Sequence, residues 1–450
     1  MEPKHIKRRD FLQASMGGAA AYALSGAMRT GPTIATAAAE PALAGGEAVR
    51  TASFPSWPVH EDHDAAAWKE VLEARNWFRF NGGAVSAFEE RYAELMGSRH
   101  CLATANGTSA LYASLNALDV GPGDEVIVPP YTFEATINVV LLQFALPIFV
   151  DTDRQSMQID AGKIEDAITE NTRCIMPVHL GGLPADMDTI LDIAERHDIP
   201  VIEDACQAHM AEWRDQKVGS LGDTGCFSFQ VTKNLPSGEG GAILTDRDDL
   251  MERAFAFHSN GRAWGQASTP SNSYNGANLR MTEFQGALLQ TQMERLEEQS
   301  RRRESNAAYL TERLEQIPGI TPAQMYEGAT RNAYHLYMFR YDSEAFQGLS
   351  RDRFRQALHA EGIPSSGGYS PQYNEPFMRE TMYSRGFLNV YGEERIDRYF
   401  DELHCPQNDQ LCKEAVWFSQ NMLLGPQSDM DDIADAIEKI HAHAETLKDA

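Results

Sequence analysis

Lys233 is the residue whose surroundings best suit covalent chemistry. It lies in the segment FSFQVTKNLPSGEGG, residues 227–241, between an apolar strand-like stretch and a glycine-rich turn. A lysine held partly out of water has a lowered pKa, and its neutral amine can condense with an aldehyde to give a Schiff base. Gly238, Gly240 and Gly241 allow tight backbone conformations close to a ligand. The segment therefore predicts a nucleophilic lysine.

Ser228 and Asp204 are the polar residues that could work with this lysine. Ser228 can offer its hydroxyl to a phosphate group. The segment VIEDACQAH, residues 201–209, is an apolar strand that delivers Glu203 and Asp204 at its carboxyl end, where an unpaired buried charge would be costly. Asp204 could keep a pyridinium nitrogen protonated so that the ring accepts electrons. The alternative is that Asp204 is a simple helix N-cap.

Residues 106–109, Asn-Gly-Thr-Ser, precede a predicted helix over residues 110–118. The free N–H groups and the dipole at such a helix start bind phosphate. The plainer alternative is an N-cap formed by Thr108 or Ser109.

The elements that must position these residues alternate between strand-like and helical segments. Predicted strands cover residues 100–104, 125–129, 146–150, 174–179, 201–203, 225–229 and 241–245. This alternation predicts a mostly parallel sheet wrapped by helices, with ligands beyond the carboxyl ends of the strands.

Helical periodicity marks residues 84–96, and a long helical pattern runs from Thr282 through Arg303 towards Ile317, with Thr282 and Gln285 forming a capping box. Residues 53–81 look loop-like. We expect a large domain over residues 53–300 and a smaller α+β domain over residues 301–450.

Six blocks carry a resemblance to a known family. They are NGTSAL, GDEVIVPPYTFEAT, PVHLGGLPADMD, VIEDACQAH, GDTGCFSFQVTKNLPSGEGG and NLRMTEFQGAL. In this order the blocks resemble the DegT/DnrJ/EryC1/StrS aminotransferases. The resemblance implies the fold type I of pyridoxal-phosphate (PLP) dependent transferases, similar to aspartate aminotransferase, with PLP as the cofactor.

The resemblance also implies a role for each matching residue. Lys233 matches the Schiff-base lysine, and Asp204 matches the carboxylate that faces the pyridine nitrogen. Gln207 matches the polar residue near the ring hydroxyl, and Phe133 looks like the aromatic residue that stacks on the ring.

The phosphate ligands implied by the resemblance are Thr108, Ser109 and Ser228. Asn278 is similar to an asparagine that reaches the phosphate from the partner subunit, which implies a homodimer with shared sites. His209 lies near the site, although a structural role is an equal alternative. Aromatic residues of the smaller domain that could line the acceptor pocket are Tyr334, His335, Tyr369 and Tyr373.

These residues predict transfer of an amino group from glutamate or glutamine to a keto-sugar or keto-cyclitol, in ping-pong fashion through pyridoxamine phosphate. Relatives that work as dehydratases carry histidine in place of the lysine, so Lys233 favours transamination. The alternatives are another PLP-dependent lyase or transferase on the same fold, or an exported PLP-fold binding or sensory protein without turnover.

The N-terminus resembles a twin-arginine export signal over residues 1–39. The stretch KHIKRRDFL contains Arg8 and Arg9 and is followed by an Ala- and Gly-rich run, with small residues at Ala35, Ala37 and Ala39 for cleavage. We therefore expect a periplasmic or exported protein without a membrane anchor after cleavage. The alternative is a cytoplasmic protein. Export would argue against nucleotide-sugar substrates, which are largely cytoplasmic.

Charge and cysteine content narrow the possible partners. The formal net charge is −26 over 450 residues, which disfavours binding to nucleic acid. The six cysteines lack the spacing of a zinc site, so no metal is expected. Cys405 and Cys412 are close enough in sequence to form a loop disulfide in an oxidising compartment.

Overall fold

A seven-stranded sheet is the centre of the computed structural model, which describes residues 39–265 and 274–448. Two hydrogen-bonded groups, β3-β2-β4 and β1-β9-β8-β5, are joined by parallel bridges from Ile175 to Val201 and from Val178 to Asp204. Only β9 is antiparallel to its neighbours in this described sheet. The predicted mostly parallel sheet is therefore confirmed. Its strands are β1 (His100–Thr104), β2 (Glu125–Val128), β3 (Leu146–Phe149), β4 (Thr172–Ile175), β5 (Ile202–Asp204), β8 (Thr224–Ser228) and β9 (Gly241–Thr245).

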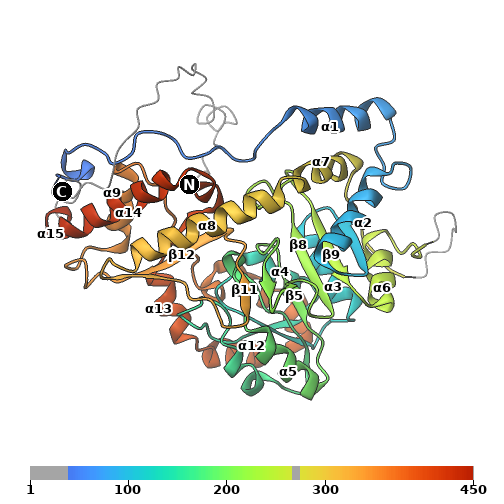
Figure 1. Cartoon of the computed structure of the whole chain (residues 1–450). Coiled ribbons are helices and arrows are strands. Elements are labelled where there is room, and N and C mark those ends of the chain that lie inside the picture. The colour runs from blue at the N-terminus through green and yellow to red at the C-terminus, as the bar shows by residue number, and fades with distance from the viewer. Residues whose placement is uncertain (1–38, 266–273, 449–450) are drawn as a thin grey trace, which may run out of the picture.

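Helices cover both faces of this sheet (Figure 1). Successive strand residues point to opposite faces, so Leu102 packs on one side and Ala103 on the other. One face is covered by α2 (Ala84–Met96), α5 (Met187–His197) and α7 (Glu283–Met293), and the other by α3 (Gly107–Ala117), α4 (Glu134–Leu142) and α6 (Asp248–His258). The sheet is thus buried on both sides, which explains its continuous apolar strands.

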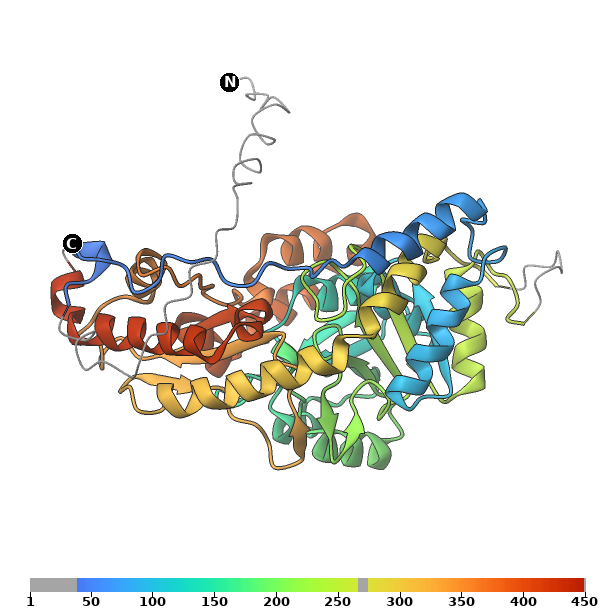
Figure 2. The same cartoon turned by 45° about the horizontal axis from the view of Figure 1, so that its top comes forward.

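A second core lies at the other end of the molecule, where α8 (Leu296–Leu314) extends from the sheet layers (Figure 2). It packs around the antiparallel strands β10 (Ile320–Pro322), β12 (Leu336–Tyr341) and β13 (Ala415–Ser419), with helices α9 (Arg351–Ala360), α14 (Gln427–Ala442) and α15 (Ala444–Leu447). The short strands β6 (Glu212–Trp213), β7 (Gln216–Lys217) and β11 (Ala329–Arg331) form a third small sheet. The predicted limits of the two domains stay a prediction.

Helices from the C-terminal third also pack on the large sheet. They are α10 (Pro376–Met382), α11 (Arg385–Tyr391) and α12 (Glu393–Glu402), and α13 (Pro406–Glu414) follows them. Buried Met378, Phe387 and Ile396 share a cluster with Val126 of β2 and Leu146 of β3.

Two sequence-based expectations need correction. Residues 53–81 are not all loop, because α1 (Asp62–Ala74) lies within them. The long pattern after Thr282 is two helices, α7 and α8, that meet at Glu294 and Arg295. The capping box of Thr282 and Gln285 is confirmed.

Cys405 and Cys412, for which the sequence left a loop disulfide open, are both free thiols. Most of the predicted export signal, residues 1–38, lies outside the described part of the chain. Among the described helices none is long and apolar enough to cross a membrane.

Candidate active site

The site forms at the carboxyl ends of β5 and β8, where the chain leaves the sheet. Asp204 is the last residue of β5 and is almost completely buried. Its Oδ2 accepts a hydrogen bond from the Thr136 hydroxyl at 2.8 Å, and its Oδ1 accepts from the N–H of Cys206 at 3.2 Å. The next described element after Asp204 is the strand β6 and not a helix, so the alternative of a helix N-cap is wrong. The carboxylate is instead held at the end of a strand with both oxygens oriented.

The neighbouring acid, Glu203, points to the other side of the strand and is structural. It accepts hydrogen bonds from the N–H groups of Gly219, Leu221 and Gly222, each at 2.7 Å, and lies 2.9 Å from His179 Nε2. Only Asp204 of the acidic pair is therefore left for chemistry.

Lys233 lies in the loop between β8 and β9. Its N–H donates to the carbonyl of Gln230 at 2.8 Å. Burial lowers the pKa of Lys233 below its ordinary value, although the nearby Cys206 thiol and Asp204 carboxylate oppose the change. The lowered pKa favours the neutral, nucleophilic form of the amine compared with an exposed lysine.

A cradle for an anion lies at the start of α3. The N-cap is Asn106, whose side chain accepts from the N–H of Ser109 at 2.8 Å, so the expected cap at Thr108 or Ser109 is wrong. A Cβ atom on Gly107 would lie 2.8 Å from both Cys206 Sγ and Ser228 Cβ. The helix therefore begins directly against Ser228. The hydroxyls of Thr108 and Ser109 are not needed for the cap, and the first-turn N–H groups lack intrahelical acceptors.

Phe133 and Gln207 are the two other residues for which the sequence predicted contacts with the cofactor ring. Phe133 is the N-cap residue of α4, one turn before Thr136, and its side chain is 47% exposed. An exposed phenylalanine at this position has a free ring face for a ligand. Gln207 is buried, and its Oε1 accepts from the N–H of Gly181 at 2.7 Å while its Nε2 donates to the Tyr369 hydroxyl at 3.1 Å.

His209 has a structural place. Its Nδ1 lies 3.0 Å from the Tyr92 hydroxyl and its Nε2 lies 2.8 Å from the carbonyl of Ser228. Burial lowers the pKa of His209 to about 3, so the ring is neutral. A neutral ring that donates to the Ser228 carbonyl fixes the end of β8, next to the anion cradle.

The four aromatic residues of the C-terminal part separate into two groups. Tyr369 reaches Gln207, and His335 is buried close enough to Lys233 for the lysine charge to help lower the histidine pKa. Tyr334 stacks on Tyr337, and Tyr373 is engaged by Asp409 and Asn408. Asn278 is exposed on the segment that precedes α7.

Comparison with known proteins assigns the chain to a family. The model of the DegT/DnrJ/EryC1/StrS aminotransferase family matches residues 58–417. The chain belongs to that family. It is a PLP-dependent aminotransferase, as its residues predicted.

Similar proteins extend over nearly the whole chain. An L-glutamine:2-deoxy-scyllo-inosose aminotransferase of Streptomyces fradiae is 35% identical, over 90% of this chain and 98% of that protein. An L-glutamine:scyllo-inosose aminotransferase of Streptomyces griseus is 34% identical, over 89% and 97%. The crystal structure of 3-amino-5-hydroxybenzoic acid synthase is 32% identical with a TM-score of 0.76, covering 89% of this chain and all of that one. The predicted fold type I is confirmed.

Thr136 is a residue of this site that the sequence did not single out. Its signal was present, because Thr132 and Thr136 stand one helical turn apart in the block that contains Phe133. Their hydroxyls are 2.9 Å apart, and the pair continues to Asp204.

Proposed function

We propose that this enzyme transfers the amino group of L-glutamine to the ketone of a cyclitol, with PLP held by Lys233. The observation that carries the proposal is the convergence of Lys233, Asp204 and Ser228 at one edge of the sheet. The relatives named above, which act on glutamine and scyllo-inosose compounds, support the donor and acceptor.

The residues present fit the cofactor. Asp204 is placed to hold a pyridine nitrogen protonated, and the exposed ring of Phe133 offers a stacking surface. The α3 start with Ser109 and Ser228 suits a phosphate, since only a glycine at 107 lets the backbone approach so closely. When bound, PLP supplies the electron sink for the α-carbon of the donor.

Lys233 performs the proton transfers. Its lowered pKa leaves a fraction of neutral amine, which can bind the cofactor covalently and, once released by the donor, can take the proton from the donor's α-carbon. In the second half-reaction the same Nζ returns a proton to the former keto carbon. Gln207 and Tyr369 orient the bound groups, and Asp204 stays paired with the pyridine nitrogen through both halves.

The acceptor fits a polar space beside Tyr369. A cavity of about 600 Å³ is lined by Arg351, Tyr369, Ser370, Asn374, Asp409 and Lys413 among other residues. Hydroxyl, amide and charged groups of this kind suit a polyhydroxylated ring. A keto-sugar is the second candidate acceptor, because the same groups can bind its hydroxyls.

The first experiment is the absorption spectrum of the protein with PLP, wild type beside Lys233→Ala. We expect a visible band that is lost in the variant and bleached by L-glutamine, followed by its recovery with scyllo-inosose or 2-deoxy-scyllo-inosose. A band that persists in the variant would exclude Lys233 as the anchor. A band that glutamine does not bleach would favour a binding protein or another PLP reaction.

We also propose a homodimer with shared sites. Trp68, Trp77 and Phe78 expose 46%, 50% and 39% of their surfaces near α1, and the Arg280 guanidinium lies 5.4 Å from the centroid of Phe78. Exposed aromatics in one region are typical of an interface. Asn278 is two residues from Arg280, at the edge of this region.

Mixing two inactive variants tests the shared sites. In a heterodimer of Lys233→Ala and Asn278→Ala, one site carries both defects and the other carries none, so activity returns to about one quarter of the wild-type value after random exchange. If Asn278 serves its own subunit, mixing restores nothing.

Export through the twin-arginine route is a further part of the proposal, supported by Arg8 and Arg9 and the small-residue run that follows. Fractionation of cells that express the wild type and the Arg8→Lys/Arg9→Lys variant tests it. If the wild type stays in the cytoplasm, the alternative of a cytoplasmic protein holds and the export proposal is wrong.

A further inference from the structure

The segment from Arg50 to Asp64, which we call the N-terminal arm, connects the two cores. At the start of the arm the Arg50 guanidinium pairs with Asp429 of α14 at 2.8 Å. The backbone N–H of Arg50 donates to the Glu361 carbonyl at 3.0 Å. The arm then runs beside α8 and enters α1 (Figure 2). It therefore crosses from the second core to the sheet layers.

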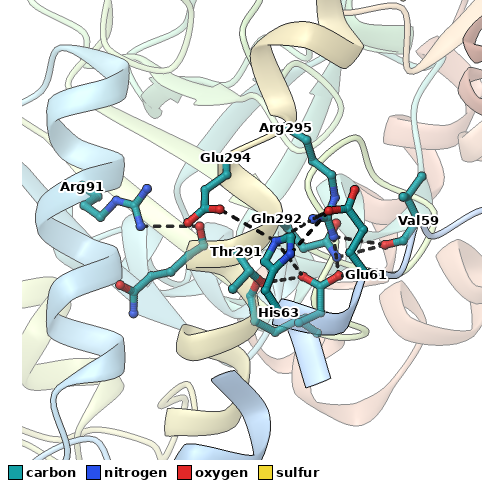
Figure 3. Close-up of polar contacts among 11 residues, drawn as sticks. Val59, Glu61, His63, Arg91, Thr291, Gln292, Glu294 and Arg295 are labelled. Carbon is teal, nitrogen blue, oxygen red and sulfur yellow. Dashed lines mark hydrogen bonds and ion pairs between the residues drawn. The ribbon is translucent and has the colours of Figure 1, made fainter. Parts of the chain in front are cut away.

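The far end of the arm is fixed at the junction of α7 and α8 (Figure 3). The buried Asp64 carboxylate accepts from Thr291 Oγ1 and Arg295 Nη2, each at 2.5 Å. The Val59 carbonyl accepts from Arg295 Nη2 at 3.2 Å and from Gln292 Nε2 at 3.1 Å. Burial alone would raise the pKa of Asp64, but its hydrogen bonds with Thr291, the Glu61 backbone and Arg295 lower it below its usual value. The carboxylate thus stays charged and holds the arm at neutral pH.

Trp57 lies between these two anchors. Two residues earlier, the Pro55 carbonyl accepts from Asn421 Nδ2 at 2.7 Å, so the chain is held on both sides of the tryptophan. The guanidinium of Arg303 lies 5.3 Å from the centroid of the Trp57 ring. Arg303 is fully buried, and its Nε and Nη2 both donate to Gln420 Oε1. The cation beneath the ring and the backbone bonds at its flanks give the indole a defined position.

The indole N–H of Trp57 donates to the Val231 carbonyl at 2.9 Å. Val231 is two residues before Lys233. The Val231 N–H already donates to Gly238 at 2.9 Å, and the Lys233 N–H donates to Gln230. Trp57 is therefore the contact through which the arm reaches the loop that presents the lysine.

We propose that Trp57 is a positioning residue for Lys233, which the arm holds against the loop from both cores. This rests on the proposed function of Lys233 as the PLP anchor. The loop keeps its internal hydrogen bonds without Trp57. Within residues 39–265 and 274–448, however, it loses the one bond that joins the Val231 carbonyl to a residue outside the loop. Lys233 Nζ then samples more positions relative to Asp204, and the transfer of a proton slows.

Trp57→Phe isolates the hydrogen bond, because phenylalanine keeps a ring over Arg303 and lacks the N–H. The matched control is Trp213→Phe, which removes an indole bond of similar length, from Trp213 Nε1 to Asp188 Oδ1 at 2.8 Å. Both variants are made in the full chain and compared by thermal unfolding, so that a folding defect is recognised.

Amide exchange of residues 229–235 in the cofactor-free protein is the first readout. A hydrogen bond of ordinary strength corresponds to about a twofold to tenfold change. We expect exchange of the loop to accelerate by that factor in Trp57→Phe and to be unchanged in Trp213→Phe. With PLP bound, we expect kcat of Trp57→Phe to fall by a similar factor while its KM for the donor is unchanged. We also expect a shift in the pH at which its visible band titrates.

Asp64→Asn gives a second route to the same result, because it weakens the anchor while leaving Trp57 in place. We expect faster exchange of the loop in this variant as well. Wild-type exchange and an unmoved band in both Trp57→Phe and Asp64→Asn would overturn the proposal. The function of Lys233 would still stand if its own alanine variant lost the band.

Discussion

The Thr136 hydroxyl and the Asp204 carboxylate form a buried pair in which threonine donates to Oδ2 at 2.8 Å. The contact joins the first turn of α4 to the end of β5. It makes the orientation of Asp204 depend on a residue that need not touch the cofactor.

Thr136→Val therefore weakens the function of Asp204 without removing its charge. Loss of one donor to a buried carboxylate costs enough to lower kcat by about tenfold. Thr136→Ser keeps the hydroxyl and restores most of the rate. The measurement is steady-state kinetics together with the PLP dissociation constant. Equal kinetics for the valine and serine variants would rule out the hydrogen bond as the cause.

Gly107→Ala is expected to damage the anion cradle. The new methyl group would lie 2.8 Å from Ser228 Cβ and Cys206 Sγ, so the start of α3 must move away from Ser228. Overpacking of this kind predicts a PLP affinity lower by about tenfold or more. Gly121→Ala is the control, because nothing lies within 4 Å of its added methyl group. Titration with PLP, followed by absorbance, distinguishes the two variants.

His209 predicts a loss of stability in acid. Its pKa is about 3 in the folded protein and near 6.5 when unfolded. Between these values the unfolded chain binds one more proton, so its contribution is complete above pH 6.5 and is lost as the pH falls towards 3. The slope is about 1.4 kcal/mol per pH unit.

Urea unfolding from pH 7 to pH 4 measures this slope. His209→Gln should make it shallower, whereas His60→Gln, at an exposed position, should leave it unchanged. An unaltered slope in the first variant would mean that His209 is already charged in the folded protein.

The buried Lys233 predicts a second pH dependence of stability, this time at high pH. In the cofactor-free protein its folded pKa is below that of the unfolded chain because of burial. Above the folded value the unfolded chain holds the extra proton, so wild-type stability rises relative to Lys233→Met up to about pH 10.5. Below the folded value the methionine variant is the more stable one. Unfolding of both proteins at pH 7, 9 and 10 tests the sign.

The sequence predicted those helices and strands that are determined by the pattern of apolar and polar residues within the segment itself. Strands β1 and β9 have the expected limits because their apolar runs end at polar residues, and α2 shows a clear apolar stripe. Helix α1 was missed because its large apolar residues, Trp68 and Leu72, are exposed and form no stripe towards a core. The break between α7 and α8 has no glycine or proline to mark it. It coincides with Arg295, whose partner Asp64 is 231 residues away.

The same distinction applies to the site. Asp204, Ser228 and Lys233 were found because each lies at the end of a strand or in the loop after it, and parallel strands end at one edge of a sheet. Thr136 and Trp57 were not found, because their partners lie 68 and 174 residues away in the chain. Such pairings depend on tertiary packing. Thr132 and Thr136 stand one helical turn apart in the sequence, but that spacing does not identify Asp204 as the partner of Thr136.

The pairing of β1 with β9 has a consequence for biosynthesis. β1 is the first strand of the sheet to leave the ribosome. Its hydrogen-bonding partner, β9, begins at Gly241, which is 141 residues after His100, the first residue of β1. A Cβ on Gly241 would lie 2.4 Å from the backbone of Asn106, so β9 also forms the wall behind the start of α3. Contacts of such separation form slowly. The anion cradle therefore cannot form until more than half of the chain has been translated. Binding of the cofactor is a late event in the maturation of this enzyme.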